Sequence, residues 1–372
     1  MDFSGLVAEI ARGFSSFSLG NAVMIAAGAL LIYLAVAKEY EPVLLLPIGF
    51  GCILANVGMS SETGLFKILY DAGIKTELFP LLIFIGVGAM IDFSPLLSQP
   101  KMVLLGAAGQ FGIYATLLLA LLLKFPLNQA ASIGVIGAID GPTAIFVASK
   151  LAPELLAPIA VAAYSYMSLI PIIQTPIMRQ MTTRKERLVR MDYAPRPVSQ
   201  RIRIAFPIVV TVIISLLAPD AAPLIATLML GNLLRESGVV DRLSKSAQNE
   251  IINIATLFLG LTIGSTMTAS SFLNWQTFYI LLLGLLAFVI DTVAGLSFGK
   301  LMCWLSGYKI NPLIGACGIS AFPMAARLSA KMAQEEDFEN FILMHAMGSN
   351  TAGQLGSVIA GGLLLALVMA FH

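Results

Sequence analysis

Residues 131–150 read ASIGVIGAIDGPTAIFVASK, a stretch that places one carboxylate inside an otherwise apolar segment. Asp140 is followed at once by Gly141 and Pro142. An aspartate at the centre of a transmembrane helix costs about 2.5–3.5 kcal/mol, and a proline frees a backbone carbonyl that another group must satisfy. A cation held by the carboxylate and the freed carbonyls would offset both costs. The alternative is that Asp140 caps a helix beginning at Gly141, together with Thr143.

The composition predicts a polytopic membrane protein. Hydrophobic residues make up 58% of the chain and charged residues 12%, with a mean hydropathy of +0.88, whereas soluble domains are about 45–50% apolar and 25% charged. A net charge of +1 offers no basic face to a nucleic acid, so we expect a lipid bilayer as the surroundings and no nucleic-acid partner. Cys52, Cys303 and Cys317 form no CxxC pair and lie in apolar runs, which indicates buried hydrophobic residues.

The distribution of charge divides the chain into four parts. Residues 1–19 carry apolar side chains at helical spacing opposite charged ones, which predicts an amphipathic interfacial helix. Residues 20–181 are expected to form a first membrane repeat and residues 204–372 a second. Residues 182–203, between them, form a basic loop that the positive-inside rule assigns to the cytoplasm. The acidic stretch 60–77 is expected to be external.

Internal repetition is the strongest structural signal. Its matches are Gly51-CILANV-Gly58 with Gly231-NLLRES-Gly238, Phe84-Ile-Gly86 with Phe258-Leu-Gly260, and Gly134, Gly137 and Pro142 with Gly315, Gly318 and Pro323. The loop charges start the first copy outside and the second inside the cell, so we expect two inverted-topology repeats, as in many transporters. Several apolar segments are shorter than the roughly 20 residues of a membrane span. The fold class is therefore predicted as all-α and transporter-like, with broken helices and re-entrant hairpins.

The second copy offers neutral oxygen ligands in the segment NPLIGACGISAFPMAAR, from Asn311 to Arg327. Asn311 and Ser320 carry side-chain oxygens, Gly315 lets backbone carbonyls approach, and Pro323 breaks the helix. Hard oxygen ligands without extra charge suit Na⁺ better than a transition metal. The alternative is that these residues mediate close packing and hydrogen bonds between transmembrane helices.

A third break is predicted in the last apolar run. Between His345 and Ser357 this run contains the polar residues Ser349, Asn350 and Gln354. Under the repeat, the counterpart of this stretch is residues 163–171 of the first copy.

Five further side chains each admit two roles. Tyr164 and Tyr166 could bond a carboxylate or carry a proton, but tyrosine also serves as an interfacial anchor, and spacing alone favours anchoring for both. Arg327 could hold a substrate carboxylate bidentately or reach to lipid head groups. The same two roles are open to Lys150 and Lys331, for which the contact with head groups is favoured.

Four motifs identify a family. They are GAIDGPTAIF around Asp140, AYSYMSLIPIIQTPIM around Tyr166, NPLIGACGISAFPMAAR from residue 311, and MHAMGSNTAGQLGSVIAGG around Asn350. Together they resemble the β subunit of sodium-pumping, biotin-dependent decarboxylases, the membrane subunit shared by the oxaloacetate, methylmalonyl-CoA and glutaconyl-CoA enzymes. The resemblance covers essentially the whole chain after about residue 20.

The resemblance implies a multi-pass protein of the bacterial inner membrane that releases CO₂ from carboxybiotin and uses the reaction to export Na⁺, with uptake of a proton. The implied ligands are Na⁺ and biotin, the latter as carboxybiotin on a separate carrier and not bound covalently here. The implied partners are a carboxyltransferase α subunit, a biotin-carrier subunit and a small membrane γ or δ subunit, in an assembly containing a homo-oligomer, a trimer, of this chain. Longer members carry extra sequence, which leaves the acyl substrate open.

Carried over residue by residue, the resemblance makes Asp140 a Na⁺ and proton site and places Tyr166 in proton delivery and Arg327 at the carboxybiotin. These three are the expected catalytic residues. The expected Na⁺ ligands are Asp140, Asn311, Gly315, Ser320 and Asn350. The expected substrate-binding residues are Arg327, Ser320 and Lys150.

A rival prediction is a Na⁺-coupled secondary transporter or exchanger without decarboxylase activity, because inverted repeats and broken helices around a buried aspartate are also its signature. The basic stretch 179–203 and Arg327 favour the carboxybiotin site, which would use them. A non-catalytic membrane anchor is a third possibility, and the buried Asp140 argues against it.

Overall fold

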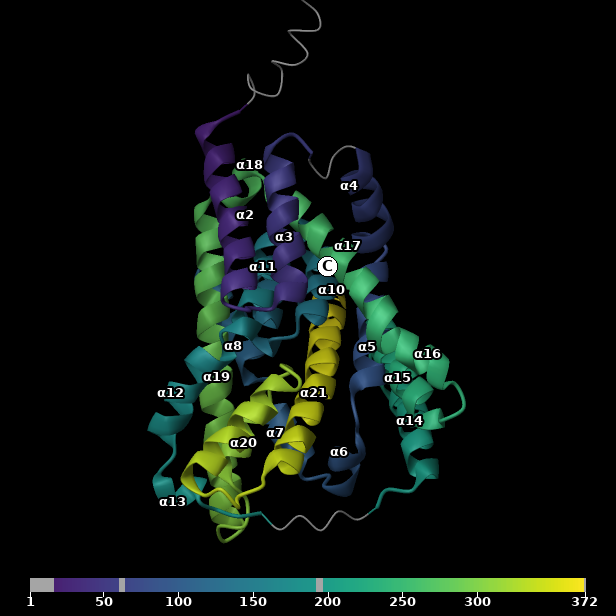
Figure 1. Ribbon diagram of the computed structural model, residues 1–372, viewed down its shortest axis with the longest axis vertical. Coiled ribbons are helices and arrows are strands. Elements are labelled where there is room, and N and C mark those ends of the chain that lie inside the picture. Colours follow the sequence, from purple (N-terminus) through teal and green to yellow (C-terminus); the bar gives the residue numbers. More distant parts are fainter. Residues whose placement is uncertain (1–16, 60–63, 192–196, 371–372) are drawn as a thin grey trace, which may run out of the picture.

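The computed structural model describes residues 17–59, 64–191 and 197–370, and every regular element within these ranges is a helix (Figure 1). Most of the amphipathic helix predicted for residues 1–19 therefore lies outside the described residues. The first half contains α2 (Leu19–Ala37), α3 (Pro42–Asn56), α4 (Gly64–Leu69), η1 (Tyr70–Ile74), α5 (Leu78–Met90), α6 (Ser94–Ser98), α7 (Met102–Ala108), α8 (Phe111–Leu122), α9 (Leu127–Gly134), η2 (Val135–Ala138), α10 (Gly141–Leu151), η3 (Pro153–Leu155), α11 (Leu156–Ser168), α12 (Ile170–Met181) and α13 (Arg184–Arg187). The second half contains α14 (Gln200–Leu217), η4 (Pro219–Ala221), α15 (Ala222–Ser237), α16 (Asp241–Ser246), η5 (Ala247–Ile251), α17 (Ile252–Ser265), α18 (Ala269–Phe272), α19 (Trp275–Leu305), η6 (Pro312–Cys317), α20 (Met324–Glu336) and α21 (Leu343–Ala370).

The helices are long and apolar enough to cross a membrane, as the composition predicts. Among the described residues, five segments pass this test: α2, the α7–α8 pair, α14, α19 and α21. Two bent pairs, α4–α5 at 57° and α11–α12 at 60°, raise the number to seven if each is one span. The prediction of an all-α polytopic membrane protein is confirmed.

Helices at matching places in the two halves pack reciprocally. Helix α3 of the first half packs against α17 of the second, and α5 packs against α15. Both contacts need a residue without a side chain, because a Cβ at Gly51 would collide with the Leu261 carbonyl and one at Gly231 with the Ile85 carbonyl. Two inverted repeats would produce this reciprocity, although the inversion itself stays a prediction.

Two broken segments return to the side from which they enter. The first, which we name hairpin 1 (residues 127–151), has its ends joined by a hydrogen bond of 2.8 Å from Asn128 Nδ2 to the Leu151 carbonyl. In hairpin 2 (residues 311–340), Asn311 and Asn340 at the two ends donate to the same carbonyls of residues 187 and 189. These are the re-entrant hairpins that the short apolar segments predict.

The two hairpins meet at their tips. The backbone N–H of Ser320 in hairpin 2 donates to the carbonyl of Ala138 in hairpin 1 at 3.3 Å. Ile139, next to this contact, has a φ of 53° and ends the η2 turn, so the chain changes direction just before Asp140. In Figure 1, α10 of hairpin 1 lies in the upper half of the molecule and α20 of hairpin 2 in the lower half.

The break predicted between His345 and Ser357 is wrong. Helix α21 runs without interruption over 28 residues, seen in yellow in Figure 1. Its polar residues are satisfied without a break because Asn350, Gln354 and Ser357 recur at helical spacing on the face toward the hairpins. Polar side chains in an apolar run therefore marked a buried polar face.

Candidate functional site

Asp140 lies at the N-terminal end of α10 and is 5% exposed. Its Oδ1 accepts the backbone N–H of Thr143 at 3.4 Å, so the capping role weighed from the sequence is present. Its Oδ2 accepts three further bonds: from Thr143 Oγ1 at 2.7 Å, Gln354 Nε2 at 2.9 Å and Ser357 Oγ at 2.9 Å. The carboxylate is thus held by donors from hairpin 1 and from α21.

Gln354 and Ser357 were not assigned to the site from the sequence. Their spacing of three residues places both on one face of α21, and Asn350 lies one turn before Gln354 on the same face. This spacing of polar residues within an apolar helix is the signal that could have found them. Without Asp140 as their partner, however, they are equally typical of helix packing.

A cavity of about 100 Å³ lies beside Asp140. Its polar residues are Asp140, Ser320 and Gln354, and its apolar wall includes Val87, Met90, Met167 and Phe322. Since one probe sphere of about 10–15 Å³ suffices for a water, a small cation with some of its waters fits this space. The structure therefore brings Asp140 and Ser320, two of the predicted ligands, to one cavity.

The carbonyls freed by the break in hairpin 2 are bound by side-chain amides. Gln174 Nε2 donates to the Ala316 carbonyl at 2.7 Å, and Gln110 Nε2 to the Gly318 carbonyl at 3.2 Å. Asn350 Nδ2 donates to two more, of Cys317 at 3.3 Å and Ile319 at 2.7 Å. Four successive backbone carbonyls thus accept hydrogen bonds from side-chain amides. These bonds satisfy the carbonyls that the helix break leaves free, so no cation is needed for that purpose.

These three amides leave their own oxygens unused. Gln110 Oε1, Gln174 Oε1 and Asn350 Oδ1 are buried and accept no hydrogen bond from the described residues. A buried oxygen of this kind is a hard, uncharged donor atom. Asn350 therefore holds hairpin 2 through its nitrogen and keeps its oxygen available.

Asn311 and Gly315 lie where they serve packing. Both amide hydrogens of Asn311 are used on the carbonyls of Arg187 and Val189, and its Oδ1 accepts the Leu313 N–H. Gly315 packs directly on α19, where a Cβ would collide with the carbonyl of Gly295. For these two residues the alternative of packing and hydrogen bonding describes the observed contacts.

The two tyrosines of α11 point in different directions. The Tyr166 hydroxyl donates to the Leu281 carbonyl of α19, and its ring lies against Gly284. The Tyr164 ring lies against Gly141, next to Asp140, and is 2% exposed. Sequence spacing could not show which tyrosine lies near Asp140, because tertiary packing determines which face of α11 contacts α10.

Lys150 and Arg327 lie on different hairpins. Lys150 lies in the last turn of α10 and pairs with Glu77, at the end of the stretch predicted to be external, with Nζ 2.9 Å from Oε1. Arg327 is exposed on α20 and forms no ion pair with any described residue; the ends of its hairpin are bonded to the basic segment around α13. The structure does not bring Lys150 to the Arg327 site.

Three arginines of the basic loop are paired with acids at the end of hairpin 2. Arg184 and Arg187 contact Glu336 at 3.2 and 2.6 Å, and Arg190 contacts Asp337 at 2.6 Å. The Arg187 guanidinium, with help from Arg184, holds the pKa of Glu336 below its ordinary value, and Arg190 does the same for Asp337. We name this group the arginine clasp. Its arginines are not free to bind an acidic substrate.

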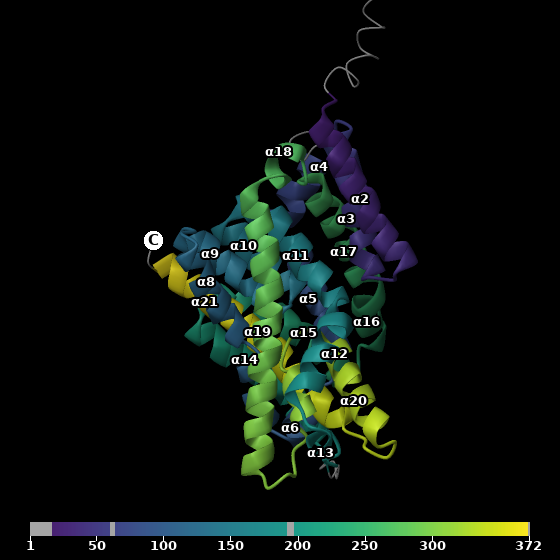
Figure 2. The same cartoon turned by 90° about the vertical axis from the view of Figure 1, so that its left-hand side faces the viewer.

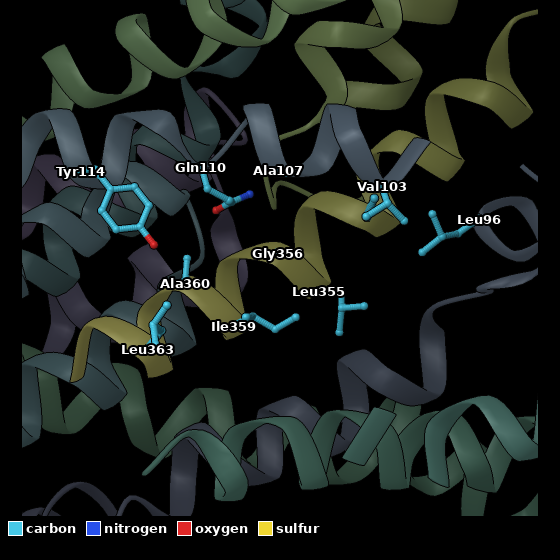
Figure 3. A pocket seen from close by; sticks show the side chains of 11 residues that line it. Leu96, Val103, Ala107, Gln110, Tyr114, Leu355, Gly356, Ile359, Ala360 and Leu363 are labelled. Carbon is cyan, nitrogen blue, oxygen red and sulfur yellow. The ribbon is translucent and has the colours of Figure 1, made fainter. Parts of the chain in front are cut away.

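A larger cavity, of about 350 Å³, lies between α7, α8 and α21 (Figure 3). Among the described residues that line it, Gln110 and Tyr114 carry the only long polar side chains, and none is charged. Figure 3 shows Gln110 and Tyr114 on one side and Gly356, Ile359 and Leu363 on the other. Asp140 lies outside this cavity, so we place the chemistry at the smaller one.

A second buried carboxylate was not predicted from the sequence. Asp291 lies in the middle of α19, is fully buried, and accepts the backbone N–H of Gly112 at the start of α8. A single Asp within a 31-residue apolar helix was the available signal. Its contact with a helix N-terminus indicates a role in fixing α8 against α19.

Comparison with known proteins gives a consistent result. Residues 20–368 match the family described as "Na+-transporting oxaloacetate decarboxylase beta subunit". The chain is 53% identical over 357 residues to the methylmalonyl-CoA decarboxylase subunit beta of Veillonella parvula, covering 96% of this chain and 95% of that protein. It is 53% identical over 359 residues to the glutaconyl-CoA decarboxylase subunit beta of Acidaminococcus fermentans, with the same coverage. It is 47% identical over 422 positions to the oxaloacetate decarboxylase beta chain of Klebsiella pneumoniae, covering 96% and 97%.

Proposed function

The chain belongs to the family of Na⁺-transporting oxaloacetate decarboxylase beta subunits, and from this premise we propose that it couples decarboxylation of carboxybiotin to Na⁺ export. The relatives are named as beta subunits or chains of decarboxylases, and the matching family is described as Na⁺-transporting. Their names include three different substrates of decarboxylation. The proposal therefore concerns the step on carboxybiotin and leaves open which substrate donates the carboxyl group.

We propose the same kind of partners for this chain. A carboxyltransferase α subunit would load CO₂ onto biotin, a biotin-carrier subunit would bring carboxybiotin to hairpin 2, and a small γ or δ membrane subunit would join the assembly. A trimer of this chain is part of the proposal. Arg327, exposed and free of ion pairs with described residues, is the cation proposed to hold the carboxylate of carboxybiotin.

The observation that supports the proposal is the setting of Asp140. A buried carboxylate with four donors, beside a cavity large enough for a small cation, is suited to hold either Na⁺ or a proton. Loss of CO₂ from N-carboxybiotin leaves a ureido anion that takes up one proton to give biotin. We propose that Na⁺ and this proton compete for Asp140, with Ser320 and Asn350 as further ligands and Tyr166 in proton delivery.

Coupling by competition also has an energetic reason. Moving one positive charge outward costs about 2.3 kcal/mol per 100 mV of membrane potential. A site that held Na⁺ and a proton at once would let the decarboxylation run without transport. A single carboxylate that binds either Na⁺ or the proton, but not both, prevents decarboxylation without transport.

The test is CO₂ release from free N-carboxybiotin by the purified chain in detergent, with and without Na⁺, in the wild type and in Asp140→Asn. We expect Na⁺-stimulated release that is abolished in the variant. Release in Asp140→Asn that still responds to Na⁺ would refute the role of Asp140. Na⁺ binding without any CO₂ release, even after addition of the carrier subunit, would favour the alternative of a Na⁺-coupled secondary transporter.

A further inference from the structure

We propose that the two cavities beside Gln110 and Tyr114 bind an uncharged, mainly apolar molecule that carries a hydroxyl group, a long-chain alcohol. The inference goes beyond the proposed function, because it concerns neither Na⁺ nor carboxybiotin. The cavity in Figure 3, of about 350 Å³, lies between α7, α8 and α21. A second, of about 580 Å³, lies between α7, α8 and α19. Ala107, Gln110 and Tyr114 line both of them.

Gln110 contributes an acceptor without a donor. Its side chain is 4% exposed, and Oε1 accepts no hydrogen bond from the described residues. The amide group cannot be reversed, because Nε2 lies 3.1–3.2 Å from the carbonyl oxygens of Gly106, Gly318 and Gly353. Reversal would bring Oε1 against three other oxygens. A buried acceptor of this kind is unfavourable until a donor reaches it.

Tyr114 contributes a second polar group without a partner, and it lies far from either end of its span. No hydrogen bond joins its hydroxyl to a described residue. The span runs from Met102 to Leu122, and a rise of 1.5 Å per residue places Tyr114 about 18 Å from one end and about 12 Å from the other. Tyrosines of membrane proteins gather at the two interfaces, where the hydroxyl meets water. At this depth the hydroxyl needs another partner.

The two groups together select a hydroxyl as the ligand's polar group. Gln110 and Tyr114 are four residues apart at the start of α8, so they share one face, and Figure 3 shows both directed toward α21. An amide oxygen can only accept, whereas a tyrosine hydroxyl donates or accepts. One alcohol hydroxyl can therefore donate to Gln110 Oε1 and also bond to the Tyr114 hydroxyl. A ketone has no hydrogen to donate to Oε1.

The lining of the cavities favours a small alcohol over a phospholipid. No charged residue is among the described residues that line either cavity, so nothing would balance a phosphate. Both volumes fall within the roughly 300–1,000 Å³ of small-molecule sites, which are likewise apolar with a few polar groups. Val103 and Leu363, on the wall of the smaller cavity, are 50% and 41% exposed, which leaves a path from the bilayer.

The experiment uses 1-octanol with a photoreactive diazirine in its chain, added to the purified full chain in phosphatidylcholine nanodiscs. Mass spectrometry then locates the labelled residues. We expect saturable labelling of α8 and α21 beside Tyr114, displaced by excess 1-octanol. In Tyr114→Phe the concentration for half-saturation should rise about two- to tenfold, as expected for one lost hydrogen bond. Ala107→Leu, which fills space in both cavities at an exposed position, should also weaken the labelling.

Tyr279→Phe is the matched control, because Tyr279 is 41% exposed, against 40% for Tyr114, and lines neither cavity. It should match the wild type. Equal labelling by the diazirine of octane, which lacks the hydroxyl, or unchanged labelling in Tyr114→Phe would overturn the inference. So would absence of labelling together with disulfide cross-links between copies through a cysteine at position 363, because a second copy would then cover the cavity. Since the measurement needs no Na⁺ and no carboxybiotin, its outcome is independent of the proposed function.

Discussion

Ser357 shows how a single neutral residue can set the affinity of the site. Its Oγ donates to Asp140 Oδ2 at 2.9 Å. A hydrogen bond to a charged group is worth roughly 1.5–3 kcal/mol, so Ser357→Ala should raise the Na⁺ concentration for half-maximal CO₂ release by about tenfold or more. Initial rates over a Na⁺ titration measure this. Ser297→Ala is the control, because the Val293 carbonyl, on an exposed face of α19, is the one partner of the Ser297 hydroxyl among the described residues. Equal Na⁺ requirements in the two variants would show that the Ser357 donor is unimportant.

Asp291 is expected to act on stability through one hydrogen bond. In Asp291→Leu the Gly112 N–H loses its acceptor in a buried place, and the free energy of unfolding should fall by about 1–3 kcal/mol. Asp291→Asn keeps an acceptor oxygen and removes the charge, so it should be no less stable than the wild type. Unfolding titrations in mixed detergent micelles measure the difference. If both variants lost the same stability, the carboxylate charge, and not the bond to Gly112, would be what matters.

At this scale, the sequence identified the charged centre but only some of its neighbours. Asp140 is recognisable because an acid in an apolar run is costly wherever the chain folds. The roles of Asn311 and Gln354 depend on partners more than 120 and 200 residues away, the Val189 carbonyl and Asp140. An amide can bind an ion or a carbonyl equally well, so its partner had to be seen.

The arginine clasp links the segment between the halves to hairpin 2, and its strength should depend on pH. Because the Arg187 and Arg184 guanidiniums lower the pKa of Glu336 below its ordinary value of 4.5, the clasp contributes stability above that pH. The contribution is lost as the pH falls through the lowered pKa. Glu336→Gln should therefore melt at a lower temperature than the wild type near pH 7, and the gap should narrow as the pH falls below 4.5.

Thermal melts of both proteins across this pH range provide the measurement. Glu250→Gln is the control, because Glu250 is exposed and forms no ion pair with any described residue. It should follow the wild type at every pH. A gap between Glu336→Gln and the wild type that stayed constant down to pH 3 would mean that the ion pairs with Arg184 and Arg187 do not cause it.

Helices and hairpins were predictable where the length and polarity of a segment determine its structure. They were less predictable where side chains can satisfy the backbone groups that a break would leave free. The two hairpins follow from short apolar segments with Gly and Pro. In α21 a similar density of Gly, Ser and Asn left the helix intact, because no proline interrupts residues 343–370 and the polar side chains find partners on the hairpins. Composition alone does not distinguish these outcomes.

At the scale of the whole molecule, the cavity beside Asp140 lies toward one end of α5. Val87 and Met90, near the C-terminal end of α5, line it. Glu77 precedes the other end of α5 and pairs with Lys150 of hairpin 1. Figure 2, which turns the molecule by 90°, shows α2 and α3 displaced to one side of α10 and α11. The Lys150–Glu77 pair joins hairpin 1 to α5 at the end predicted to be external. We therefore expect Asp140 to be closed off from the outside and accessible from the inside of the cell.

Release of Na⁺ to the outside then requires the Lys150–Glu77 contact to open, with the hairpins moving against a scaffold of the early helices of each half. A short thiol cross-linker between cysteines at positions 77 and 150 should abolish Na⁺ transport in proteoliposomes, and cleavage of the linker should restore it. The buried Cys52, Cys303 and Cys317 would first be replaced by alanine. The control joins positions 21 and 56, where Asn21 and Asn56 lie 3.4 Å apart between α2 and α3, within the same body. Cross-linking there should leave transport unchanged. Full transport with positions 77 and 150 joined would show that the outer contact stays closed throughout the cycle, and that Na⁺ leaves by a path that does not separate hairpin 1 from α5.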